Sequence, residues 1–257
     1  MYRSRLAARC TGLLLFALVL IISEPKQAAA ADAEEAAQRA AELLKQVRVN
    51  RGLCVVVGQD PDVILELVQS SDLTVLVREP DAAARARLQQ AAVEAGLGID
   101  RLVIQSGSVK QLPYADRLID AVITSNPNLT DGEAMRALRP EGALIRTEGE
   151  TLVTKRRPTQ KGAGDWSHWE HGPDNNPVST DSVIKAPYMT QFMARPYYIG
   201  MPSITTAAAG RTFLAIGHIA HHRREWKNLN KLVARNGYNG TVLWEKPLPE
   251  GYLVHRS

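Results

Sequence analysis

Between residues 50 and 147 the chain alternates short apolar runs with helix-favouring stretches, and this alternation limits it to few folds. Each apolar run has four to six residues, and several end at a glycine or a polar residue. Such runs are typical of strands buried on both faces of a parallel sheet. We predict strands at residues 53–57, 73–77, 101–104, 119–124 and 142–146. The order implies a doubly wound, Rossmann-like α/β sheet with helices on both faces.

Helix signals stand before and between these runs. Residues 33–47 are rich in alanine, glutamate, leucine and lysine, a composition that favours helix. Asp60 and Pro61 have the residue types preferred at an N-cap and at the first helical position. The predicted helices cover residues 33–47, 63–68, 81–95 and 130–138. In such folds, ligands bind beyond the carboxyl ends of the strands, so that edge is the predicted ligand site.

Three motifs in this α/β segment carry a family resemblance. They are VVVG at residues 55–58, GSVKQLPY at 107–114 and AMRALRPEG at 134–142. Their order resembles the class I, type 11 group of S-adenosylmethionine-dependent methyltransferases, and the resemblance covers about residues 50–147. In that family the first loop approaches the methionine part of the cofactor, an acid after the second strand holds the ribose, and Gly-Asp-Ala contacts the adenine. The resemblance implies cofactor-binding positions at Gly58, Asp60, Glu79, Gly107, Ser108 and Ser125.

The chain departs from the family in the cofactor loop. Where the family has Asp-x-Gly-x-Gly-x-Gly, residues 56–62 read VVGQDPD. Asp60 and Asp62 replace two glycines, and their charges would face the cofactor's carboxylate at a helix start that normally attracts anions. Ser108 replaces the acid beside the adenine. We therefore expect a degraded cofactor loop. The alternative, that Asp60 is a helix cap and Glu79 a solvated strand end, stays open.

Composition changes sharply near residue 150. Residues 32–150 carry 19 acidic and 13 basic side chains, whereas residues 151–257 carry 7 and 14. All six histidines and all four tryptophans follow residue 150. We predict a methyltransferase-like domain over residues 32–150, a connector over 151–190 that includes the basic triplet 155–157, and a second domain over 191–257. The triplet lacks interleaved aromatic residues, so no nucleic-acid partner is expected.

Residues 1–31 have the layout of an export signal. Arg3, Arg5 and Arg9 precede an uncharged apolar run over residues 11–22, and small residues follow at 28–31. The run has 12 residues, fewer than the ~20 that a membrane-spanning helix needs. We expect a secreted or periplasmic protein of the cell envelope. Contact with a membrane is expected only through an uncleaved signal.

Residues 191–257 are predicted to form β structure. Residues 231–246 (KLVARNGYNGTVLWEK) indicate two strands joined by a turn with two Asn-Gly dipeptides. This unit is similar to the repeat of pyrroloquinoline-quinone-like (PQQ-like) β-propellers, whose Gly-x-x-x-Trp core corresponds here to Gly240 and Trp244. A propeller needs about 4–8 blades, and this length supplies about one. We therefore expect the rest of the propeller to be missing and no PQQ to bind this fragment.

Histidines are the remaining candidates for a functional site. The spacings His168-x-x-His171 and His218-x-x-His221-His222 match no specific metal site, and no cysteine accompanies them. We therefore predict no metal centre. Cys54, in the middle of a predicted strand, is expected to be a core residue.

The order of all these parts resembles exported planctomycete-type proteins with a methyltransferase-like domain, a Trp–His–Asn connector and a quinoprotein-like propeller. Trp166, His171 and Asn176 match the connector. Our hypothesis is a binding or structural module beside a PQQ-like propeller, with a small-molecule ligand as its potential partner. Two alternatives stay open. One is an active S-adenosylmethionine-dependent methyltransferase of unknown acceptor, and the other is a fragment of a quinoprotein-type oxidoreductase or assembly scaffold.

Overall fold

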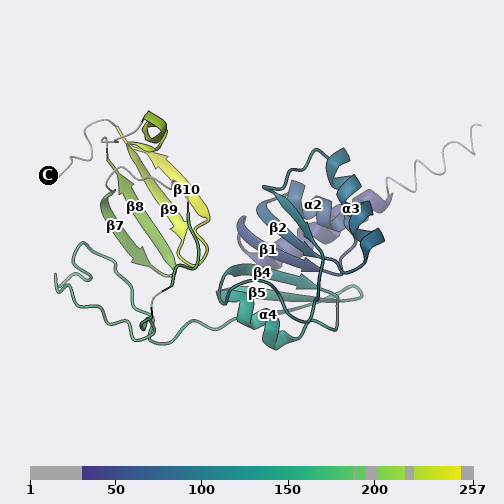
Figure 1. Ribbon diagram of the computed structural model, residues 1–257, viewed down its shortest axis with the longest axis horizontal. Coiled ribbons are helices and arrows are strands. Elements are labelled where there is room, and N and C mark those ends of the chain that lie inside the picture. The colour runs from purple at the N-terminus through teal and green to yellow at the C-terminus, as the bar shows by residue number, and fades with distance from the viewer. Residues whose placement is uncertain (1–30, 188, 195–201, 218–222, 250–257) are drawn as a thin grey trace, which may run out of the picture.

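A computed structural model describes residues 31–187, 189–194, 202–217 and 223–249, which form two sheets joined by a long connector (Figure 1). The predicted export signal lies outside the described residues except for residue 31, and so do His218, His221 and His222. Within the described ranges, no helix combines the length and apolar character that a bilayer crossing requires.

The first sheet has six strands in the order β3-β2-β1-β4-β5-β6. They are β1 (Arg51–Val57), β2 (Asp72–Arg78), β3 (Leu102–Gln105), β4 (Ile119–Thr124), β5 (Leu138–Glu148) and β6 (Thr151–Arg156). Strands β1 to β5 pair in parallel, and β6 is antiparallel to β5. This is the strand order of Rossmann-type sheets, and the predicted α/β fold is confirmed.

Helices cover both faces of this sheet, as the βαβ order predicted. They are α2 (Pro61–Gln69), α3 (Ala82–Glu94), α4 (Asp131–Ala137) and a helix over residues 31–47. The 31–47 helix, α2 and α3 share one apolar cluster with the sheet, and α4 belongs to the cluster on the opposite face (Figure 1). A loop over residues 106–118 completes that second face in place of a helix, through Val109 and Leu112.

Cys54 lies in β1 and is fully buried. Burial, and then the negative charge of Asp120, raise the pKa of its thiol to about 12. The thiol is therefore neutral near pH 7 and is a poor nucleophile. The prediction that Cys54 is a core residue is confirmed.

The first sheet extends beyond residue 150, where the sequence placed the start of the connector. Strand β6 pairs with β5 across a turn at Gly149, which has a φ of +61°. Alternate β6 side chains are exposed, so this edge strand has the polar composition of a linker. Lys155 pairs with Asp131 at 2.6 Å, and Arg157 Nη1 donates to the carbonyl oxygen of Leu138 at 2.5 Å. The basic triplet therefore belongs to the sheet and its margin.

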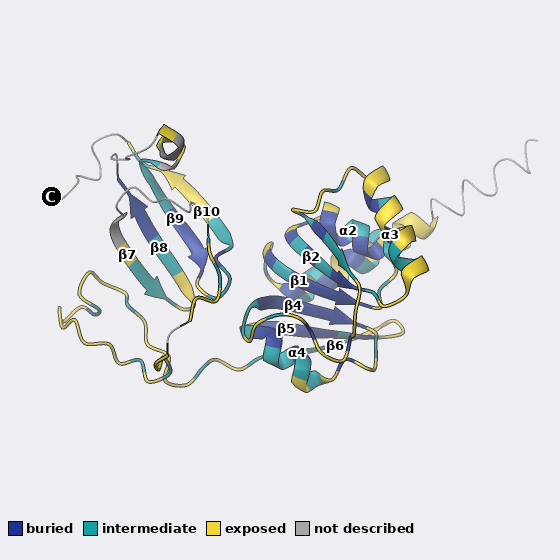
Figure 2. Cartoon of the chain, in the orientation of Figure 1, coloured by how far each residue is buried: buried dark blue, intermediate teal, exposed yellow. Residues whose placement is uncertain are grey.

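The second sheet is antiparallel, in the order β10-β9-β8-β7. Its strands are β7 (Pro202–Ala208), β8 (Arg211–Ile216), β9 (Lys231–Asn236) and β10 (Val242–Pro247), with a short 3₁₀ helix, η1 (Arg223–Asn228), before β9. The predicted strand, turn and strand over residues 231–246 are confirmed. The outer strand β10 is largely exposed (Figure 2), and Trp244 on it is 42% exposed.

Candidate functional site

The predicted cofactor positions share one edge of the parallel sheet. The register pairs Val57 with Thr124, so β1 and β4 end side by side. It also pairs Arg78 with Gln105, so β2 and β3 end side by side. The residues that follow these ends include Gly58, Glu79, Gly107, Ser108 and Ser125, and Asp60 precedes α2. Parallel pairing thus brings residues far apart in sequence to one place. We call this place the strand-end crevice.

The centre of the strand-end crevice is closed by the chain itself. Ser125 Oγ donates a hydrogen bond to the carbonyl oxygen of Gly58, linking the loops after β4 and β1. Gly58 has a φ of +71°, and a Cβ there would lie 2.9 Å from Ser125 Oγ. Asp60 caps α2, since its Oδ1 accepts the N–H of Asp62 at 2.9 Å. Gly58 and Asp60 are thus held in contacts within the protein.

Arg78 fills the other half of the strand-end crevice, a role that the sequence analysis missed. Arg78 is only 7% exposed, and its Nη2 donates a hydrogen bond to the carbonyl oxygen of Ser108 at 3.3 Å. A Cβ on Gly107 would lie 3.4 Å from Arg78 Cζ and closer still to Nη2. The guanidinium therefore occupies the space against Gly107 and Ser108 where the resemblance placed the adenine. Within the described part of the chain, Arg78 Nε has no hydrogen-bond acceptor.

Tyr114 adjoins this buried arginine. Its hydroxyl donates to Gln105 Oε1 at 3.0 Å. Burial raises the pKa of Tyr114 to about 12, against the opposing effect of the Arg78 charge. The phenol is therefore neutral near pH 7 and serves to hold the end of β3.

Glu79, the predicted ribose-binding acid, accepts a hydrogen bond at the start of α3. Its Oε1 accepts the backbone N–H of Asp81 at 2.9 Å. Its carbonyl oxygen accepts from Arg85 Nη1 at 2.8 Å. Asp81 in turn caps α3 through Ala84. The carboxylate that the sequence assigned to a cofactor therefore already has a structural partner.

An acidic hollow of about 810 Å³ lies beside the strand-end crevice, between the 31–47 helix, the start of α2 and the β5–β6 turn. Arg39 is the one cation among its lining residues, and it donates to the carbonyl oxygens of Gly149 and Glu150 at 2.9 Å each. The acids that line it are Asp32, Glu35, Glu42, Asp60, Asp62 and Glu150. This charge disfavours a carboxylate or phosphate at the start of α2.

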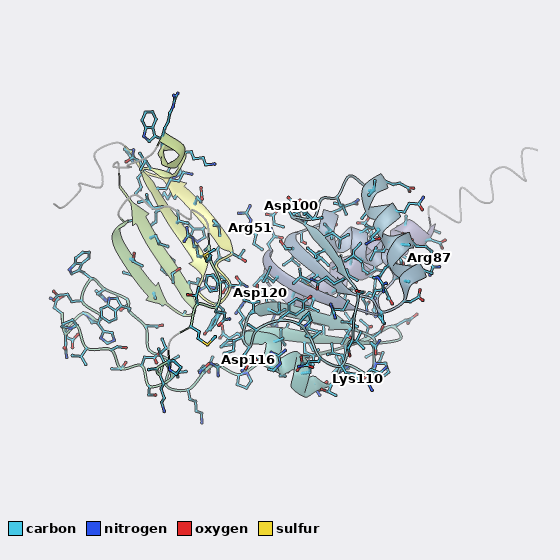
Figure 3. All side chains as sticks on the ribbon, in the orientation of Figure 1. Arg51, Arg87, Asp100, Lys110, Asp116 and Asp120 are labelled. Atoms are coloured by element: carbon cyan, nitrogen blue, oxygen red, sulfur yellow. The ribbon has the colours of Figure 1, made fainter. Side chains whose placement is uncertain are left out.

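The opposite, amino-end edge of the sheet carries a buried carboxylate, Asp120, that accepts four hydrogen bonds. Asp120 lies in β4, and its side chain is 1% exposed. It pairs with Arg139 Nε, and its Oδ2 accepts the N–H of Leu53 at 2.9 Å. Figure 3 shows Asp120 on the side of the parallel sheet that faces the second sheet. A charge so deeply buried requires such partners.

Two asparagines of the β9–β10 turn complete the partners of Asp120. Asn236 Nδ2 donates to Asp120 Oδ1 at 2.9 Å, and Asn239 Nδ2 donates to Oδ2 at 2.7 Å. The Oδ1 atoms of both asparagines accept N–H groups two residues ahead, at Tyr238 and Thr241. These turns orient both amides toward the carboxylate. We call Asp120, Arg139, Asn236 and Asn239 the inter-sheet clasp.

The sequence did not predict the inter-sheet clasp, although two features mark its members as residues that need partners. Asp120 is the one charged residue of the buried strand β4, and such a residue needs donors. Asn236 and Asn239 were interpreted as turn residues of a hairpin, which they are. Their spacing also places two amides on one side of the turn. What the sequence alone did not supply was the partner, 116 residues away.

The connector histidines form local contacts. Ser167 Oγ lies 2.8 Å from His168 Nδ1, and the rings of His171 and Trp166 meet edge to face with centroids 5.2 Å apart. Backbone hydrogen bonds join Trp166 to Ala207 of β7. In the part of the chain that the structure describes, no three His, Cys, Asp or Glu side chains gather as metal ligands.

Comparison with known proteins identifies similar solved structures. No protein-family model matches the sequence, and no curated protein matches it. A putative S-adenosyl-L-methionine-dependent methyltransferase from Methanococcus maripaludis has 20% identity and a TM-score of 0.38, over 42% of this chain and 52% of that one. A putative sarcosine dimethylglycine methyltransferase from Galdieria sulphuraria has 19% identity and a TM-score of 0.39, with 48% of each chain covered.

The [4+2]-cyclase SpnF is also similar, at 20% identity and a TM-score of 0.39, with 44% of each chain covered. The chain spans about half the length of the solved structures it matches. Two of these proteins are named as methyltransferases and one as a [4+2]-cyclase, so the likeness assigns no activity to this chain.

Proposed function

We propose that residues 31–157 form a non-catalytic, methyltransferase-like support module of an exported protein. The observation that carries the proposal is the filled strand-end crevice, in which Arg78 lies against Gly107 and Ser125 is bonded to Gly58. These residues do not fit S-adenosylmethionine, because side chains of the protein take up the space that the cofactor would need. Asp60 and Glu79 are likewise engaged at helix starts.

In this proposal the module holds the antiparallel sheet through its opposite edge. The inter-sheet clasp supports this role, since it joins a carboxylate of β4 to two amides of the β9–β10 turn. Four antiparallel strands in consecutive order are also the arrangement of one propeller blade. We infer that the second sheet is a PQQ-like blade that the module supports. An activity of the protein would then belong to the propeller.

Titration of the whole chain with S-adenosylmethionine tests the non-catalytic assignment. We expect no heat of binding by calorimetry up to about 1 mM ligand, and S-adenosylhomocysteine should behave in the same way. Thermal unfolding supplies a second readout, because a ligand at 100 times its Kd would add about 2.7 kcal/mol to the free energy of unfolding. Micromolar binding, with a rise in Tm, would contradict the proposal and favour an active methyltransferase.

A further inference from the structure

A second cavity, of about 550 Å³, lies between the amino-end edge of the parallel sheet and the turns of the antiparallel sheet. One wall comes from the segment that enters β1, from the start of β5 and from the end of β6. Its other wall comes from residues 209–211, in the β7–β8 turn, together with Asn236 and Leu243. This volume is within the range of small-molecule sites in proteins.

The lining of this cavity is strongly basic. Six guanidinium groups surround it, against the carboxylates of Asp120 and Glu141. The arginines are Arg48, Arg51, Arg139, Arg156, Arg157 and Arg211. They come from separate segments of both sheets, so folding alone brings them together. Figure 3 shows Arg51 and Asp120 on this side of the parallel sheet.

Two of these arginines have carboxylate partners. Arg139 pairs with Asp120, and Arg51 pairs with Asp72 at 3.1 Å. Arg156 Nη2 donates to a neutral acceptor, the carbonyl oxygen of Gln46, at 2.6 Å.

The other four arginines form no close ion pair with a described residue, although Arg157 Nη1 donates to carbonyl oxygens at the end of α4. Among the described residues, no carboxylate lies within ion-pair distance of Arg48, Arg156, Arg157 or Arg211. The lining therefore keeps an excess of positive charge, because Glu141 is the one acid among the lining residues to set against these four guanidinium groups once Asp120 is paired with Arg139.

The crowding of like charges has a visible electrostatic effect. Burial, and then the charges of Arg48 and Arg139, lower the pKa of Arg156 against the opposing charge of Glu141. Burial, and then the charge of Arg117 outside the lining, lower the pKa of Arg157 against the opposing charge of Asp116. Charged guanidinium groups repel one another most strongly where water is partly excluded, so an anion placed among them would relieve that repulsion.

We propose that this cavity binds a small molecule that carries two or more phosphate or sulfate groups. Guanidinium groups present parallel N–H donors that match the oxygens of such anions, and four of them exceed what one monovalent anion can neutralise. Arg211 lies on the antiparallel sheet, whereas Arg48, Arg156 and Arg157 belong to the parallel-sheet module. The bound anion therefore bridges the two sheets beside the inter-sheet clasp. A long polyanion fits less well, because the arginines converge on a hollow.

Calorimetric titration of the whole chain with inorganic pyrophosphate tests the proposal. We expect one site per chain with a Kd below 1 mM in 50 mM sodium chloride, and weaker binding as the salt concentration rises. Arg48→Gln and Arg211→Gln should each weaken binding about tenfold, because each removes a charged donor. Both side chains are exposed and without described partners, so the fold should survive, and circular dichroism checks this.

Arg87→Gln is the matched control. Arg87 is an exposed arginine on α3, on the side of the module away from the second sheet (Figure 3). The Arg87→Gln substitution should leave the Kd for pyrophosphate unchanged. Titration with adenosine 5′-diphosphate distinguishes an inorganic ligand from an organic one. An affinity equal to that of pyrophosphate identifies the diphosphate as the recognised group. Tighter binding than that of pyrophosphate indicates that the nucleoside also binds in the cavity.

Three results would overturn the proposal. One is the absence of pyrophosphate binding at 1 mM. Another is an equal loss of affinity in Arg87→Gln, or no loss in the Arg48→Gln/Arg211→Gln double variant. The third is binding of heparin without binding of pyrophosphate, which would indicate a surface for long polyanions.

Discussion

Asp120→Ala should lower the free energy of unfolding by about 3–5 kcal/mol, because it leaves a half-buried arginine without its counter-charge. The variant also removes acceptors from the N–H of Leu53 and from the amides of Asn236 and Asn239. Denaturant unfolding followed by circular dichroism measures the change.

Asp72→Ala is the control for this substitution, since Asp72 also pairs with an arginine, Arg51. Both side chains of that pair are nearly half exposed, so we expect a loss of at most about 1 kcal/mol. If Asp120→Ala costs no more than Asp72→Ala, the carboxylate of Asp120 does not hold the structure together as described.

Gly52→Ala should have the second largest effect, a loss of about 2–4 kcal/mol in the free energy of unfolding. Gly52 has a φ of +151°, and a Cβ there would lie 2.6 Å from Asp120 Cγ. The carboxylate cannot move aside without breaking its bonds to Arg139 and the two asparagines. The same denaturant titration reports the loss.

Gly96→Ala separates backbone strain from the clash with Asp120. Gly96 follows α3 with a φ of +68°, and a Cβ there would meet nothing within 4 Å. Its substitution should cost about 1 kcal/mol, the strain of a left-handed residue alone. Equal losses for Gly52→Ala and Gly96→Ala would contradict the close approach of Gly52 to Asp120.

The fold of the parallel sheet was largely predictable because its signals are local. Local patterns of a few residues predict strand β1, the helix cap Asp60 and the hairpin over residues 231–246. The sequence did not predict strand β6, because every second residue of this edge strand is exposed. The strand therefore has the polar composition that a linker also has.

The candidate site was less predictable, because its chemistry depends on contacts between distant residues. The motifs predict that Gly58, Gly107 and Ser125 share one edge, because parallel pairing brings the strand ends together. The motifs do not predict that Arg78 fills the space beside Gly107, because tertiary packing decides the direction of that side chain. The pairing of Asp120 with Asn236 likewise has no local signal.

A double-mutant cycle between Asp120→Ala and Asn239→Ala tests the central claim, that the parallel-sheet module holds the antiparallel sheet. Their direct hydrogen bond predicts an interaction energy of about 1.5–3 kcal/mol. The cycle of Asp72→Ala with Asn239→Ala, which share no partner, should be additive within about 0.5 kcal/mol. Additivity in the Asp120–Asn239 cycle as well would contradict the claim.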